Sequence, residues 1–153
     1  MEALESFGSG VAGACALTLI HETVRRVVPD APRMDVLGMR AIAKSMRAAD
    51  AEPPAEDELH KMAMAGDIVG NSLYYSLVGL GGREKAWMCG ALLGLSAGVG
   101  AVLLPEPLGL GDDASARTPA TKAMTIAWYL AGGLAAAATY RCLTASTSSR
   151  ESD

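Results

Sequence analysis

Residues 87–104 read WMCGALLGLSAGVGAVLL, residues 123–140 read AMTIAWYLAGGLAAAATY, and neither stretch contains a charged residue. Each is about as long as the roughly 20 apolar residues that an α-helix needs to cross a bilayer core of ~30 Å. We therefore predict two membrane spans, over about 86–105 and 121–141.

Two further apolar tracts reach spanning length only by including polar residues. One covers residues 6–26 and contains His21 and Glu22 near its end, and the other covers residues 62–82 and contains Asp67. Helices are the spanning structures that satisfy every backbone hydrogen bond within the segment. Counted as spans, these tracts complete a four-helix bundle.

The predicted fold is therefore all-α: a polytopic membrane protein with four transmembrane helices in one domain over residues 1–145. The polar residues 146–153 are predicted to form a disordered tail. The 17 glycines among 153 residues suit this class, because glycine is frequent in membrane helices. A soluble bundle is the alternative, and the modest mean hydropathy of +0.23 gives it some support. Four such tracts, however, leave few polar residues for the outer faces of a soluble bundle.

Lysine and arginine gather in two of the three connections, residues 27–61 and the connection before the last span. Positively charged loops stay in the cytoplasm. The pattern predicts a multi-pass protein of the cell (inner) membrane with both termini outside the cytoplasm. The net charge of −4 comes without a basic face suited to nucleic acid, so no nucleic-acid partner is expected.

The first loop contains its own helical pattern over about 34–49, in which Arg40, Lys44 and Arg47 share one edge. Such an amphipathic helix can lie on the membrane surface with these cations at lipid headgroups. The alternative is a short helix that caps the bundle. The sequence does not choose between them.

Polar residues near the cytoplasmic side of the first two spans predict an interior cluster. Helical spacing places Asp67 and Asn71 on one face of the second span, and the end of the first span reaches the same leaflet. Because an uncompensated carboxylate inside a membrane is costly, we expect Asp67 to pair with Arg25 or Arg26. The predicted cluster consists of His21, Glu22, Arg25, Arg26, Asp67 and Asn71. Either it is a structural contact between helices, or it binds a proton, an ion or a solute.

No motif for catalysis or for a cofactor is recognised. A copper site at His60, Met62 and Met64 is the best metal alternative, but two methionines two residues apart diverge on a helix. The three cysteines have no paired or metal-binding spacing and are predicted to be small buried hydrophobes. We expect a protein that is not an enzyme and that holds neither cofactor nor metal.

Glycines spaced four residues apart predict close helix packing. The residues concerned are Gly66, Gly70, Gly90, Gly94 and Gly98. These rows either pack inside one chain, or the row in the third span joins copies of the chain into a homo-oligomer.

The stretch HETVRRVVPDAPRMDVLGMRAIAK, residues 21–44, resembles small multi-spanning proteins of bacterial inner membranes, and no named family is assigned from it. The favoured function is that of a non-enzymatic scaffold or accessory protein that contacts the lipid bilayer or partner membrane proteins. The alternative is a small transporter-like oligomer that handles ions or protons at the cluster around Asp67.

Overall fold

The computed structural model describes residues 2–150, and every regular element in that range is helical. The elements are α1 (Glu2–Val24), α2 (Met34–Ala48), α3 (Glu56–Ser76), the short 3-10 helix η1 (Leu77–Gly81), α4 (Gly82–Leu103) and α5 (Pro119–Arg150). The predicted all-α class is confirmed.

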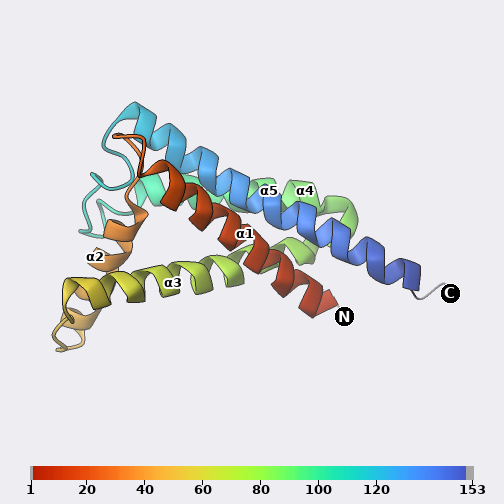
Figure 1. The fold of residues 1–153 in the computed structure, drawn as a ribbon, viewed down its shortest axis with the longest axis horizontal. Coiled ribbons are helices and arrows are strands. Elements are labelled where there is room, and N and C mark those ends of the chain that lie inside the picture. The colour runs from red at the N-terminus through yellow and green to blue at the C-terminus, as the bar shows by residue number, and fades with distance from the viewer. Residues whose placement is uncertain (1, 151–153) are drawn as a thin grey trace.

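Four long helices, α1, α3, α4 and α5, run along the length of the molecule, and the shorter α2 lies at one end (Figure 1). The connections on either side of α2 and the connection between α4 and α5 meet at that end. The N-terminus, the α3–α4 join and the end of α5 lie toward the opposite end. We call the end that holds α2 the polar end.

Local chemistry explains where the helices begin and end. Thr118 caps α5, since its Oγ1 accepts the backbone N–H of Thr121 at 3.0 Å, and Pro119 is the first helical residue. Three acidic residues in the first turn of α3 favour the positive end of its dipole. The α3–α4 join turns at Gly82, whose φ of 63° is a conformation that glycine adopts without strain.

The α4–α5 seam is packed through glycine. Gly90, Gly94 and Gly98 are buried on α4, and a methyl group built at Gly94 would lie 2.6 Å from the Cα of Leu130 on α5. The two backbones therefore approach one another directly. This row packs inside the chain, which is the first of the two alternatives predicted for it.

The glycines of α3 do not pack in this way. No atom lies within 4 Å of a methyl group built at Gly66 or Gly70. Helix α1 instead meets α3 at Gly10, where an added methyl group would overlap the carbonyl of Ser72. The close packing predicted at Gly66 and Gly70 is wrong, because α3 turns a different face toward its neighbours.

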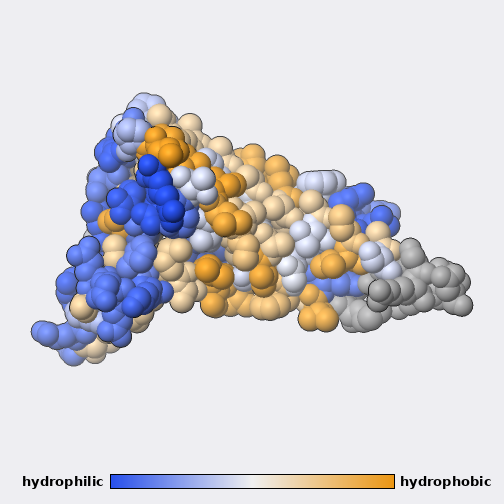
Figure 2. Space-filling model, in the orientation of Figure 1, coloured by the Kyte–Doolittle hydropathy of each residue, from blue (hydrophilic) through white to orange (hydrophobic). Residues whose placement is uncertain are grey.

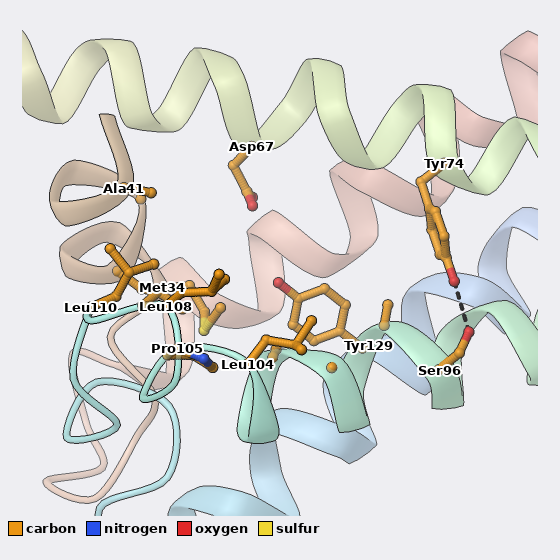
Figure 3. A pocket seen from close by; sticks show the side chains of 15 residues that line it. Met34, Ala41, Asp67, Tyr74, Ser96, Leu104, Pro105, Leu108, Leu110 and Tyr129 are labelled. Atoms are coloured by element: carbon orange, nitrogen blue, oxygen red, sulfur yellow. Dashed lines mark hydrogen bonds between the residues drawn. The ribbon is translucent and has the colours of Figure 1, made fainter. Parts of the chain in front are cut away.

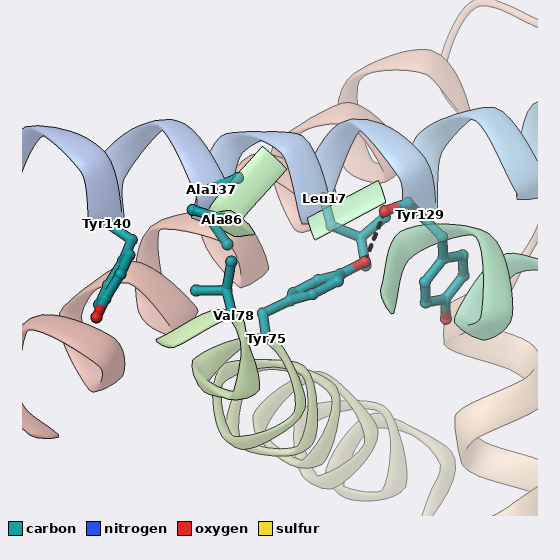
Figure 4. Close-up of a cluster of buried hydrophobic side chains, with 8 residues drawn as sticks. Leu17, Tyr75, Val78, Ala86, Tyr129, Ala137 and Tyr140 are labelled. Carbon is teal, nitrogen blue, oxygen red and sulfur yellow. Dashed lines mark hydrogen bonds between the residues drawn. The ribbon is translucent and has the colours of Figure 1, made fainter. Parts of the chain in front are cut away.

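A compact cluster of buried side chains joins α1, α3, α4 and α5 (Figure 4). At its centre the hydroxyl of Tyr75 donates to the backbone carbonyl of Tyr129 at 2.8 Å. Leu17 and Val78 are fully buried beside it. The hydroxyl thus has a partner although the ring is buried, as the low polarity of a core requires.

Apolar side chains cover the middle of the molecule, and hydrophilic residues gather at the polar end and again toward the opposite end (Figure 2). Two helical stretches of the described residues, Ala3–Val24 and Glu56–Leu103, are long and apolar enough to cross a membrane. Helix α5 is not one of them. Buried helices of soluble proteins and signal sequences meet the same criterion. The choice between a membrane protein and a soluble one therefore depends on which side chains the outer surface exposes.

Two sequence expectations about this surface are corrected. Helix α5 includes residues 146–150, which were predicted to be disordered, and residues 151–153 lie outside the described residues. Within α5 the Ser146 hydroxyl donates to the carbonyl of Cys142 at 3.1 Å, so it is satisfied by the helix itself. All three cysteines are free, but Cys15 and Cys142 are exposed, because the buried faces of their helices point elsewhere.

Candidate functional site

A lateral groove of about 490 Å³ runs between α3 and α4 (Figure 3). Asp67 and Tyr74 lie on its α3 wall, and Ser96 lies on α4. Tyr129 of α5 contributes an aromatic ring. The end of the groove is closed by α2 and by the connection after α4, through Met34, Leu37, Gly38, Ala41, Leu104, Pro105, Leu108 and Leu110. The groove is mostly apolar, with a few polar groups at defined places.

Asp67 is the charged residue that lines this groove. Its carboxylate and the hydroxyl of Tyr129 point toward one another from opposite walls (Figure 3). One carboxylate oxygen, Oδ1, accepts the side-chain amide of Asn71 at 2.9 Å. The same amide donates to the backbone carbonyl of Asp67 at 2.9 Å, which fixes the rotamer of Asn71. The predicted proximity of Asp67 and Asn71 is therefore present.

A second polar contact crosses the groove about two helical turns after Asp67 on α3. The hydroxyls of Tyr74 and Ser96 lie 2.7 Å apart, and Tyr74 also donates to the carbonyl of Leu93 at 3.1 Å. This contact ties α3 to α4 where the two helices draw together.

The arginines predicted to pair with Asp67 pair elsewhere. Arg25 forms two hydrogen bonds to Glu22, at 2.8 and 2.6 Å, and lies 3.6 Å from Asp35. Arg26 is mostly exposed and lies 3.9 Å from Glu22. Among residues 2–150 no ion pair joins Asp67 to either arginine. The predicted Asp67–arginine pair is wrong, because carboxylates on α1 and α2 already hold these cations.

Asp35, at the start of α2, is the acid that the sequence argument missed. Its side chain is only 4% exposed, and Arg33 binds it through two hydrogen bonds of 2.9 and 2.8 Å. Burial raises the pKa of Asp35, but the hydrogen bond and charge of Arg33, with the Val36 N–H and Arg25, outweigh it and hold the pKa below its ordinary value. The available signal in the sequence was an arginine, Arg33, two residues before an aspartate in the first turn of a predicted helix.

His21 is buried at the end of α1. Its ring lies against Trp128, with centroids 5.1 Å apart, and against the edge of Tyr129 at 5.8 Å. Within the described part of the chain its Nε2 has no hydrogen-bond partner, and neither has the Oγ1 of nearby Thr18. An unpaired buried polar atom costs free energy, so these two atoms require an explanation.

Both atoms belong to residues that line a small cavity of about 20 Å³, more closed than the groove, which we call the enclosed cavity. The cavity lies between α1, α2 and α3. Its lining residues are Thr18, His21, Glu22, Met34, Asp35, Ala63, Met64 and Asp67. Asp67 therefore lies between two spaces, the enclosed cavity on one side and the apolar groove on the other.

A wider depression of about 700 Å³, which we call the vestibule, opens at the polar end. It is lined by Arg25, Arg33, Asp35, Met39, Glu56, Asp57, His60 and Lys61. Asp35 lines both the vestibule and the enclosed cavity. His60, which shares a helix face with Asp67 in the sequence, thus lies in the vestibule and not beside Asp67.

Two of the three cations on α2 bind the connection after α4. Arg40 bonds Asp113 at 2.6 and 3.0 Å and the carbonyl of Leu110 at 3.0 Å, and Lys44 donates to the carbonyl of Leu108 at 2.5 Å. Arg47 is exposed. These contacts favour the helix that caps the bundle over a helix whose basic edge is free for lipid headgroups.

The described residues include no group of three or more His, Cys, Asp or Glu side chains placed to hold a metal ion. Comparisons of the chain with protein-family models, with curated proteins and with solved structures find no match. The function is therefore argued from the groove, the cavity and the surface around them.

Proposed function

We propose that this chain is a small multi-pass membrane protein of accessory or scaffold type that contacts lipid or a partner membrane protein and catalyses no reaction. The observation that carries the proposal is the inverted pattern of α4. Its buried positions are Ala86 and three glycines, whereas its outer face exposes Trp87, Met88, Leu92, Leu95, Val99 and Leu103. Small residues inside and large apolar residues outside are typical of helices that pack in lipid.

A soluble bundle predicts the opposite arrangement, with polar residues on the outer face of each helix. Helix α3 exposes Ile68, Val69 and Leu73 as well, so the apolar outer surface is not confined to one helix. Contiguous apolar surface of this kind marks contact with a membrane or another protein. The groove gives that contact a recess, whose apolar walls suit a hydrocarbon chain.

The finer topology has four spans, over about 6–26, 62–82, 86–105 and 121–141, with both termini outside the cytoplasm of a bacterial cell. Support comes from Figure 1, in which the cation-rich connections lie together at the polar end. Helix α5 is not one of the two stretches that are apolar enough by themselves to cross a membrane, but it packs along α1 and α4, so lipid meets only part of its surface.

Cysteine labelling tests this topology. Single cysteines replace Ser45 and Ser146, both exposed, in a background without the three native cysteines. A membrane-impermeant maleimide on intact cells should label position 146 and leave position 45 unlabelled until the cells are opened. Labelling of position 45 alone would invert the orientation. Recovery of the chain in the soluble fraction would contradict the membrane proposal itself.

A second candidate function is reversible binding of a proton or an ion at Asp67. It is favoured by one observation: a carboxylate that lines an apolar groove without a cationic partner among the described residues. Ionisable residues inside membrane segments are costly to bury, so those that occur there are usually functional. The two candidates are compatible, because a protein that binds an apolar chain in the groove can do so in a protonation-dependent way.

Infrared spectroscopy of the reconstituted protein tests the second candidate. A carboxyl band that is lost in Asp67→Asn should change with pH in the wild type. Asp57→Asn, at an exposed position in the first turn of the same helix, is the matched control and should leave that band in place. A band from Asp67 that does not respond to pH anywhere in the range where the protein stays folded would remove this candidate.

A further inference from the structure

The enclosed cavity has the size and the chemistry of a site for one water molecule. Its volume of about 20 Å³ exceeds the 10–15 Å³ that one water requires. A buried water is held by two to four polar partners. The unpaired Nε2 of His21 and Oγ1 of Thr18 supply two, and they belong to lining residues of this cavity. His21 is 5% exposed, so bulk solvent does not satisfy it.

Asp67 supplies the third partner. Asn71 occupies its Oδ1, which leaves the second carboxylate oxygen able to accept a hydrogen bond. Water fits this mixed set better than a cation does. A hydroxyl and an imidazole each donate or accept, and a water molecule can donate to the carboxylate while it accepts from either of them.

The other charged groups around the cavity are already paired. Glu22 on α1 is held by Arg25, and Asp35 on α2 is held by Arg33. From α5, Tyr129 faces Asp67 across the groove without a charge (Figure 3). Asp67 and His21 are thus the titratable groups at the cavity that lack a charged partner among the described residues.

We propose that a water molecule held by Thr18, His21 and Asp67 connects Asp67 to the vestibule, so that Asp67 exchanges protons with the polar end of the molecule and not through the apolar groove. Asp35 forms the wall shared by the vestibule and the cavity, which places the water one residue away from the solvated surface. In each exchange the water gives one proton to the Asp67 carboxylate and receives one from the vestibule side, so it is regenerated as water. Return of the proton follows the reverse path.

This inference rests on the second candidate function, reversible protonation of Asp67, and names the route by which the proton arrives. It also gives the two sides of Asp67 different roles. The groove side of Asp67 meets an apolar occupant, while the cavity side meets water. Protonation and occupancy of the groove are then linked through a single carboxyl group.

The test measures hydrogen–deuterium exchange at the Asp67 carboxyl, identified by its loss in Asp67→Asn, in protein reconstituted into phosphatidylcholine nanodiscs and transferred to D₂O. Thr18→Val removes one partner of the water at nearly constant volume. Ala63→Val narrows the cavity from α3 and removes no polar atom. Each change should slow exchange about tenfold, the effect of about 1.4 kcal/mol on the barrier.

Two further variants serve as controls. Thr18→Ser keeps the hydroxyl and should exchange at the wild-type rate. Thr139→Val makes the same change on α5, where the hydroxyl bonds the carbonyl of Ala135 at 2.9 Å, and should have no effect. Exchange as fast as the wild type in both Thr18→Val and Ala63→Val would overturn the route. Absence of a titrating Asp67 band in every variant would instead remove the second candidate function.

Discussion

Two rows of glycine have the same spacing and different surroundings. On α4, Gly90, Gly94 and Gly98 meet the backbone of α5, whereas Gly66 and Gly70 on α3 meet no other part of the described chain. The α4–α5 seam is closed, whereas Gly66 and Gly70 lie on an exposed face of α3 and do not line the groove. A row of small residues thus permits a close approach between helices but does not specify which helix makes it.

The largest loss of stability is expected at the α4–α5 seam, where the two backbones leave no room for a side chain. In Gly94→Leu, the Cβ of the new side chain would lie only 2.6 Å from the Cα of Leu130 on α5. Because backbone and not a flexible side chain is in the way, we expect a loss of more than about 3 kcal/mol of stability or no folded protein. Thermal unfolding in mild detergent measures it. Normal accumulation and an unchanged melting temperature would mean that α4 and α5 do not pack as described.

An intermediate loss of stability is expected at Asp35, at the start of α2, where the vestibule and the enclosed cavity share a wall. Asp35→Asn leaves Arg33 and Arg25 without their shared acceptor, and we expect a loss of about 1–2 kcal/mol at neutral pH, reduced by the half-exposed position of Arg33. Asp113→Asn, which breaks the solvent-exposed pair with Arg40, is the control and should cost less.

The same variant has a pH signature. The pKa of Asp35 is lowered in the folded protein, so its contribution is present above the unfolded-state pKa and is lost as the pH falls through the lower, folded-state value. The wild type should therefore lose its advantage over Asp35→Asn in acid. An advantage that persists at the lowest pH at which both remain folded would contradict the ion pair.

The smallest change in stability is expected at Gly66, on the exposed face of α3. Gly66→Leu adds a side chain with no atom within 4 Å of its first carbon. Leucine is a better helix former than glycine by roughly 0.5–1 kcal/mol, so the variant should be neutral or slightly more stable. Unfolding in detergent and the size of the particle check this. A clear loss of stability, or a change from a larger particle to a smaller one, would show that another chain covers this face.

The sequence predicts the helices well, because length, uncharged runs and capping residues such as Thr118 act locally. It predicts the site less well. Asp67 and Asn71 were found because both lie on one turn of one helix. The partners of Arg25 were not: it binds Glu22 one turn earlier on α1, and its contact with Asp35 depends on how α1 and α2 meet in space. The cavity at His21 was not predictable either, because it requires three helices to be placed at once.

The contacts that hold the polar end join parts of the chain that are made at very different times during synthesis. Arg40 meets Asp113, 73 residues later, and Thr121 donates to the carbonyl of Asp30, 91 residues earlier. Early helices can form as soon as they leave the ribosome, but until residues 104–110 exist the end of the groove is closed by α2 alone. A nascent chain halted before that point keeps Asp67 more reachable from the end of the groove, and Tyr129 on the opposite wall is made later still, so the isolation of this carboxylate is acquired late in synthesis.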